Sequence, residues 1–448
     1  MTSLQSKMDR EDKSIKKMSN DYGSYAASQR LGCNYLHQNY IKKIMTEKLT
    51  KLFSRGSIQN ETNIIRTINL VDYGAADARN SLDIYEDMIL NVASYNQSDN
   101  KNCGKNRKVN LLIGIQDLPS NNWDLVKENI QNNLASKYDP ILYEKLSKFK
   151  SDTSLSELKE FTGTDIAIKL CPSSFYNTVS LAMPKDSVDI AFTSIATHWL
   201  SPSVIRKYDL KLSNSIIANS KLSTSFEMQQ FMNASIEDGV EFLKARGMEM
   251  RSGGKLLMCN ATRLTPEEAK AFLNKAEPND NLDKTKFLDD TSIFSTYYAV
   301  FEDITSLLKD WSQRPGIEIS FPCIPAFSKS PKEWEKCFAH PDVIKTGLVL
   351  ERGETRMFEN PYFTEAMENS KNDACPSSAE SIKKNKDFAN EYMKSIMAWG
   401  HGLFMKAFNG KAELEHEFCE ELKEKYFSRH PERYRYDFVM YFCEAAKL

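Results

Sequence analysis

The chain of 448 residues carries 59 basic and 61 acidic side chains, which leaves a formal net charge of only −2. Without a surplus of positive charge, neither a nucleic acid nor an acidic membrane surface is an expected partner. A chain of this length can form one large domain or two to three ordinary ones.

The start of the chain, MTSLQSKMDREDKSIKKMSN, is polar, and no apolar run reaches the ~18 to 20 residues that cross a bilayer. We therefore expect a soluble, cytoplasmic protein with a flexible lead over residues 1–20. Nine cysteines lie scattered without a C-x-x-C pair, and six histidines lie without an H-x-x-x-H pair. This spacing predicts reduced thiols and no metal site.

Helical and extended patterns alternate along the chain. Helical spacing of apolar residues over 22–52 predicts an opening helix, and another is expected over 81–95. Buried strands are expected at 63–72, 109–117, 186–194, 253–261, 316–325 and 434–448. This alternation predicts a doubly wound α/β domain, with a mainly parallel sheet covered on both faces.

The charged and helical stretches fit this sheet less well. Residues 262–315 and 326–429 are expected to form a mostly helical cap. The core would then consist of residues 21–261, 316–325 and 430–448.

Two predicted strands end on an aspartate, Asp72 and Asp117, and Gly74 follows the first. Such a turn lets backbone N–H groups approach a ligand, and carboxylates at neighbouring strand ends suit an amino group and ribose hydroxyls. Together they indicate a nucleoside-containing cofactor. The single glycine of LVDYGAADARNS argues against a dinucleotide or P-loop site. Taken alone, this segment could also be an ordinary strand-to-helix turn.

The stretch FTSIATHWLS places His198 and Trp199 side by side directly after a predicted strand. A wide apolar ring beside a titratable ring is typical of the edge where an α/β sheet meets its ligand. The alternative is that Trp199 packs in the core.

Five segments in chain order resemble the motifs of the SABATH family of S-adenosylmethionine-dependent carboxyl methyltransferases. They are DYGSYAASQ (21–29), VDYGAADARNS (71–81), QDLPSNNW (116–123), the block from CPSSFYNT to THWLS (171–201) and DGVEFLKARGMEMRSGGKLL (238–257). The resemblance covers roughly residues 20–260. It implies a Rossmann-like class I methyltransferase sheet with a helical cap, S-adenosylmethionine (SAM) as methyl donor, S-adenosylhomocysteine (SAH) as product, and a homodimer.

The resemblance also implies roles for individual residues. It places Asp72 and Gly74 beneath the methionine moiety of SAM. It also implies that the Gln29 amide and the Trp199 indole N–H hold the acceptor carboxylate. His198 would line the same pocket. The cofactor contacts would come from Tyr22, Asn80, Asp117, Leu118, Ser174 and Phe175. The expected reaction is O-methylation of a small carboxylic acid to its methyl ester.

Several positions depart from the family pattern. Alanines stand at 26, 75 and 78, where the family has serine, cysteine and glycine. Residues 291–293, Thr-Ser-Ile, replace an acidic segment that can hold a metal ion, so no bound metal is expected. Ile195 stands where some aromatic-acid enzymes carry tyrosine. An N-methyltransferase of a heteroaromatic nitrogen and a catalytically silent relative are the alternatives.

Overall fold

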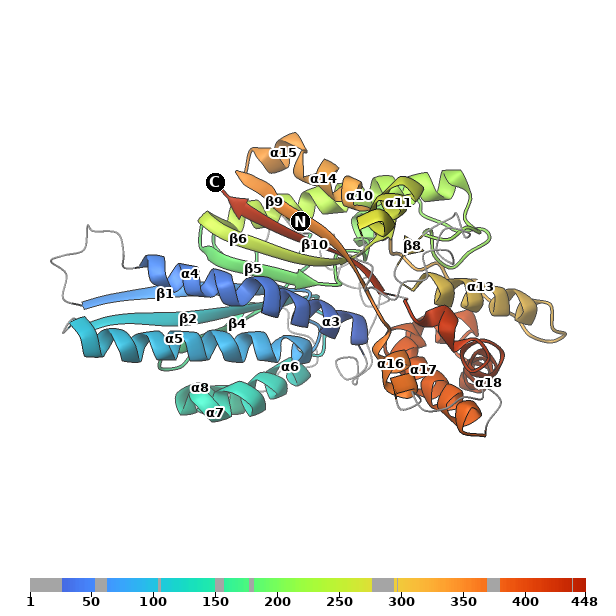
Figure 1. Cartoon of the computed structure of the whole chain (residues 1–448), viewed down its shortest axis with the longest axis horizontal. Helices are drawn as coiled ribbons and strands as arrows, with labels where there is room; N and C mark the ends of the chain where they lie inside the picture. The colour runs from blue at the N-terminus through green and yellow to red at the C-terminus, as the bar shows by residue number, and fades with distance from the viewer. Residues whose placement is uncertain are drawn as a thin grey trace.

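The computed structural model describes residues 26–52, 63–103, 106–149, 157–176, 181–275, 294–295, 297–368, 379–436 and 438–448. An eight-stranded sheet forms the centre, in the order β3-β4-β2-β1-β5-β6-β10-β9 (Figure 1). Its strands are β1 (Asn63–Tyr73), β2 (Asn106–Asp117), β3 (Lys159–Thr162), β4 (Ile166–Pro172), β5 (Val188–Ser194), β6 (Met250–Ala261), β9 (Leu348–Phe358) and β10 (Phe438–Lys447). The run β4-β2-β1-β5-β6 is parallel, and β3, β10 and β9 are antiparallel to their neighbours.

The central strands are apolar on both sides because both faces of the sheet are covered there. Successive side chains of a strand point to opposite faces. In β1, Ile68 and Leu70 join one hydrophobic cluster, whereas Val71 and Tyr73 join another. The expectation of a sheet with helices on both faces is therefore confirmed.

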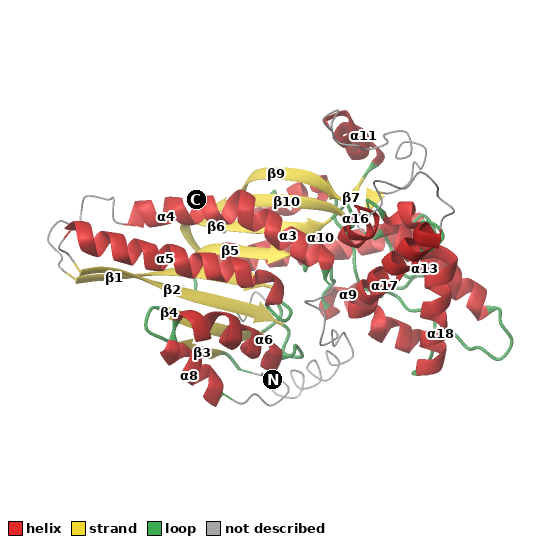
Figure 2. Cartoon of the chain, turned by 60° about the horizontal axis from the view of Figure 1, so that its bottom comes forward, coloured by secondary structure: helices red, strands yellow, loops and turns green. Residues whose placement is uncertain are grey.

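Helices from the first third of the chain cover one face (Figure 2). They are α3 (Ala27–Leu36), α4 (Lys42–Leu52), α5 (Leu82–Cys103), α6 (Trp123–Ile130), α7 (Ser136–Tyr138) and α8 (Pro140–Lys148), with π-helical turns η1 (His37–Ile41) and η3 (Gln131–Ala135). The opposite face carries α10 (Ser225–Glu249), α14 (Pro331–Phe338) and α15 (Pro341–Ile344).

A helical cap lies beyond the carboxyl ends of the parallel strands (Figure 1). It contains α13 (Tyr298–Ser312), α16 (Pro361–Glu368), α17 (Ala379–Ala407) and α18 (Ala412–Leu422), with the turns η4 (Lys423–Phe427) and η5 (Pro431–Tyr434). Shorter elements near it are α9 (Pro202–Tyr208), α11 (Pro266–Lys275) and the pair β7 (Arg263–Leu264) and β8 (Phe294–Ser295). No helix within the described ranges is both long and apolar enough to span a membrane.

Three segments differ from the expected elements. Residues 316–325 form no strand; they begin in a turn and continue without regular secondary structure, and Pro322 and Pro325 lack the N–H that a sheet ladder needs. Residues 348–358, expected in the cap, form the edge strand β9. Its residues are charged and largely exposed, as is typical of edge strands, so the sequence shows no apolar run that would indicate a strand. Residues 166–172, expected in no strand, form β4.

A buried ion pair within α10 packs against Tyr73 of β1. Arg246 and Glu249 are fully buried, and Nε of Arg246 lies 2.8 Å from Oε2 of Glu249. This N–H does not meet hydrogen-bond geometry, so the contact is chiefly one of charge. The Arg246 guanidinium lies 3.9 Å from the centre of the Tyr73 ring, and the Tyr73 hydroxyl donates to Glu249 at 2.5 Å.

Replacing Arg246→Met is expected to lower the free energy of unfolding by about 3–5 kcal/mol, because Glu249 would be left buried without its cation. Urea unfolding measures this loss. Lys244→Met on the same helix removes a partly exposed pair with Glu241 and serves as a control, with an expected loss below about 1 kcal/mol. Equal losses for the two variants would contradict a stabilising role for the buried pair.

Candidate functional site

The turn after β1 approaches β5 so closely that it needs glycine. Gly74 has φ +76°, and a Cβ there would lie 2.5 Å from the Cβ of Ala196. The N–H groups of Gly74 and Ala75 donate to the Gln116 carbonyl at 2.8 and 3.3 Å. The turn is thereby drawn against the end of β2.

Ala76 and Ala78 continue this turn in the left-handed region, with φ values of 52° and 63°. Glycine adopts such values without the steric penalty that alanine carries. This explains physically why a glycine is favoured at position 78. The chain adopts the required conformation with alanine and carries some backbone strain instead.

Asp72 points away from the turn and toward α5. Its carboxylate accepts hydrogen bonds from the Ser81 hydroxyl at 2.6 Å and from the Tyr85 hydroxyl at 2.7 Å. Burial raises the pKa of Asp72 to about 6, against the lowering effect of these two bonds. Asp72 therefore ties β1 to the helix that follows it.

Asp117 joins the ends of β2 and β1. Its Oδ2 accepts from the Ala76 N–H and its Oδ1 from the Leu118 N–H, both at 2.7 Å. Burial raises the pKa of Asp117 to about 7; the two N–H bonds lower it, and the charges of Asp72 and Asp77 add to the rise. A carboxylate oxygen offers two lone pairs, so with one donor each among the described residues both oxygens can accept a further bond from a ligand.

Gln29 of α3 reaches the same turn. Its side-chain oxygen accepts from the Asn80 amide at 3.1 Å, and its Nε2 donates to the Gly74 carbonyl over a long 3.4 Å. Among the described residues Nε2 makes only this bond, which leaves a second N–H for a ligand. The helix is pressed on the strand ends at Gly32, where a Cβ would meet Ser194 Oγ.

The segment after β4 completes this group. The Gln116 amide donates to the Ser173 hydroxyl at 2.8 Å, and the Ser173 N–H donates to the Asp117 carbonyl at 3.0 Å. The Phe175 ring lies beside the position where a Gly74 Cβ would stand, at 3.5 Å. Ser174 and Phe175 thus follow a strand that ends at the same edge as β1 and β2.

His198 and Trp199 lie in a loop after β5. The segment 316–330 forms hydrogen bonds with this loop. The Leu200 N–H donates to the Pro325 carbonyl, and the Phe327 N–H donates to the His198 carbonyl, both at 2.8 Å. Trp199 pairs with Ala326 in an isolated bridge. Pro325, Ala326 and Phe327 therefore position this loop, and residues 316–325 do not extend the sheet.

An apolar cavity with a free volume of about 50 Å³ lies between this loop and the cap. Among the described residues that line it, His198 is the only basic side chain and none is acidic. Three aromatic side chains of the cap region, Tyr297, Phe301 and Trp399, face two of the predicted residues, His198 and Trp199. The remaining lining residues are Ser28, Ile195, Ile217, Ala261, Ile324, Ala326 and Ser328.

Most of the predicted site residues fall into two neighbouring groups, whereas Asp72 belongs to neither and bonds Ser81 and Tyr85 instead. Gln29, Gly74, Asn80, Asp117, Leu118, Ser174 and Phe175 gather around the turn, and His198 and Trp199 line the cavity. Ser28 lines the cavity too, directly beside Gln29. Tyr22 and residues 291–293 lie outside the described residues. Within the described ranges no group of three or more potential metal ligands occurs.

The cap residues of the cavity were not predicted from the sequence. Tyr297, Phe301 and Trp399 come from segments about a hundred residues apart. Aromatic residues at helical spacing are more often core than ligand contacts, so no sequence pattern marked them.

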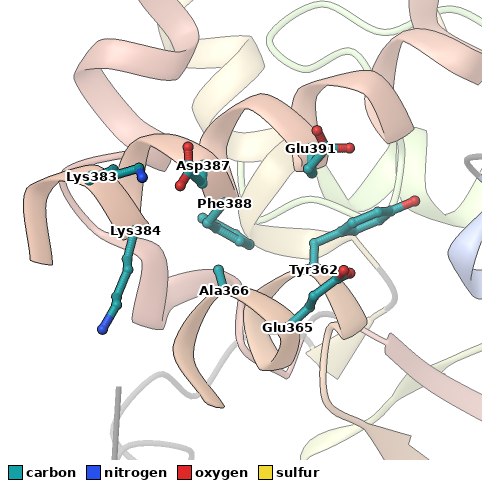
Figure 3. Close-up of a pocket in the computed structure, with 8 residues that line it drawn as sticks. All are labelled: Tyr362, Glu365, Ala366, Lys383, Lys384, Asp387, Phe388 and Glu391. Carbon is teal, nitrogen blue, oxygen red and sulfur yellow. The ribbon is translucent and has the colours of Figure 1, made fainter. Parts of the chain in front are cut away.

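A second hollow, of about 330 Å³, lies in the cap between α16 and α17 (Figure 3). Tyr362, Ala366 and Phe388 line it together with Glu365, Lys383, Lys384, Asp387 and Glu391. Its charged residues bear both signs. None of the predicted site residues lines it, so it is separate from the cavity at the strand ends.

Known proteins resemble this chain in both sequence and fold. A probable caffeine synthase, MTL2 of Coffea canephora, is 23% identical over 244 residues, which span 54% of this chain and 56% of that relative. A loganic acid methyltransferase solved with SAH shares the fold, with a TM-score of 0.56 and 13% identity over 96% of this chain and 97% of that one. Residues 15–288, more than half of the chain, match the family described as SAM dependent carboxyl methyltransferase. The chain belongs to this family of SAM-dependent methyltransferases.

Proposed function

We propose that this methyltransferase converts a small carboxylic acid to its methyl ester. The proposal is carried by the position of Trp199, which lines an apolar cavity. Next to this cavity lies helix α3, whose Gln29 amide reaches Gly74 in the turn after β1. An amide N–H and an indole N–H are neutral donors that can hold a carboxylate without a cation. The homodimeric state and the cytoplasmic location stay predictions.

The residues at the turn suit SAM. Asp117 keeps a lone pair on each oxygen for the ribose hydroxyls, and Phe175 offers an aromatic face, which favours a sulfonium cation. Leu118 and Ser174 follow the ends of β2 and β4, Asn80 lies in the helical turn Arg79–Ser81 after β1, and all three would add contacts. When bound, the cofactor supplies a methyl group that is activated by the positive charge on sulfur.

The chain's own contribution is placement. A carboxylate is ionised near neutral pH, so the acceptor needs no general base, and His198 need only line the cavity. Gln29 and Trp199 would orient the acceptor oxygen toward the turn, while Tyr297, Phe301 and Trp399 exclude water. Alignment of this kind can supply ~7–11 kcal/mol in favourable cases.

An N-methyltransferase is the second candidate. The similarity to a probable caffeine synthase favours it, and so does the lack of a carboxylate, lysine or arginine among the described lining residues. A neutral heteroaromatic nitrogen would fit such a cavity as well as a carboxylate held by neutral donors.

A substrate panel distinguishes the two reactions. Purified protein with methyl-labelled SAM is expected to convert at least one small carboxylic acid to a labelled ester. Mass spectrometry detects this ester, and mild base should cleave it. Matched heteroaromatic nitrogen compounds form the other half of the panel. Labelling of nitrogen compounds alone would refute the esterification proposal.

Trp199→Phe keeps an apolar wall and removes the indole N–H. Loss of one hydrogen bond to the acceptor is expected to lower kcat/KM about tenfold, with unchanged SAH affinity in calorimetry. Trp311→Phe is the control, because its indole N–H donates to Glu421 in the cap, away from the cavity. Full activity of Trp199→Phe would exclude an acceptor contact through this N–H.

The affinity for SAH should depend on the ionisation of Asp117. Its pKa is raised to about 7 by burial, and ribose hydroxyls donate to the ionised form. Affinity is therefore expected to be about tenfold lower at about pH 6 than at about pH 8. Calorimetry at several pH values measures this. Asp117→Asn should bind weakly at every pH with no slope, and a slope that survives in that variant would assign the titration to another group.

A further inference from the structure

The side chain of Tyr176 connects the two halves of the site. It follows directly on Ser174 and Phe175, and its hydroxyl lies 2.6 Å from the Trp199 carbonyl oxygen and 3.2 Å from that of Thr197. A phenol has one proton, so the shorter contact is the principal hydrogen bond. Its ring centre lies 4.5 Å from that of Phe175, so the two aromatic rings are in contact.

The other bonds to the loop come from elsewhere. The Thr197 carbonyl also accepts from the Lys329 amine at 3.1 Å, and the His198 carbonyl accepts from the Phe327 N–H at 2.8 Å. Both donors belong to the segment 316–330, which follows helix α13 of the cap. The Tyr176 phenol thus forms a hydrogen bond between the segment after β4, which packs on the turn after β1 through Phe175, and this loop.

The backbone of Phe175 is itself anchored. Its carbonyl accepts from the buried Arg246 guanidinium at 3.0 Å, and its ring lies against the Gly74 turn. A ligand that fixes the position of Phe175 therefore also fixes Tyr176. Because a 2.6 Å hydrogen bond weakens steeply when it is stretched or bent, the Trp199 backbone must follow.

We propose that Tyr176 is a positioning residue that couples cofactor binding at the turn to the placement of Trp199 in the cavity. Coupling between two sites is reciprocal, so the acceptor should strengthen cofactor binding by the same factor. The assignment of Trp199 to the acceptor rests on the proposed function, whereas the coupling between turn and loop can be tested without any acceptor.

The test uses the full chain labelled with 5-fluorotryptophan and SAH as the probe. The five tryptophans give separate ¹⁹F signals, and Trp199→Phe identifies the signal of Trp199. Saturating SAH is expected to shift this signal in the parent protein. In Tyr176→Phe the shift should be lost, while SAH affinity in calorimetry stays within about threefold, since that hydroxyl bonds the loop and not the ligand.

Tyr208→Phe is the matched control. It removes a phenol that bonds Glu237 on the surface and should leave the shift unchanged. A full shift in Tyr176→Phe, or no shift in the parent protein at saturation, would overturn the proposal. So would a tenfold or greater loss of SAH affinity in Tyr176→Phe, because Tyr176 would then act on the cofactor itself.

A kinetic measurement gives a second readout. With an acceptor identified by the substrate panel, Tyr176→Phe should raise the acceptor KM about fivefold to tenfold at saturating SAM, as the loss of one hydrogen bond predicts. An unchanged acceptor KM would contradict the proposal. A protein that shows the SAH-induced shift but methylates no acid would disprove the proposed reaction and leave the coupling intact.

Discussion

The close approach of the turn at Gly74 to the end of β5 is the constraint on which the site depends. Its φ of +76° and its position against Ala196 leave no room for a Cβ. Because the turn is drawn in this far, its N–H groups reach Gln116 and Asp117, and the ring of Phe175 rests beside it. Three parallel strands that are distant in sequence therefore present their ends to one small volume, which is where open α/β sheets bind ligands.

The site combines polar groups at the turn with aromatic side chains of the cap region. The polar groups lower the free energy of unfolding. Asp117 is half-buried and forms no ion pair with a described residue, and its desolvation raises its pKa to about 7. A carboxyl that binds its proton more tightly in the folded protein than in the unfolded chain lowers stability as pH rises from about 4 to about 7. A ligand that donates hydrogen bonds to the ionised carboxylate offsets this cost. The left-handed alanines of the same turn add strain, as is common at functional sites.

The site is held by contacts from two sides. The buried Arg246 and Glu249 lie under the strand ends, and Arg246 reaches the Phe175 carbonyl. On the other side, the segment 316–330 bonds the loop of His198 and Trp199 at successive backbone groups. The turn after β1 is therefore anchored to the sheet, and the loop of His198 and Trp199 is anchored to the segment that follows the cap helix α13. A few contacts, such as the Tyr176 hydrogen bond, can set the position of one relative to the other.

The sequence by itself determined the alternation of strands and helices, the aspartates and glycine at the strand ends, and the family, because these depend on local periodicity and on motifs within short segments. It did not reveal β9, whose exposed charges hide an edge strand, nor the role of residues 316–325, whose apolar pattern resembles a strand while their prolines prevent pairing. Only the tertiary structure decided that Tyr297, Phe301 and Trp399 line one cavity with Trp199, and that Gln29 contacts Asn80. The reason is physical: these contacts join residues far apart in the chain, and the packing of whole helices against the sheet, not any local pattern, brings them together.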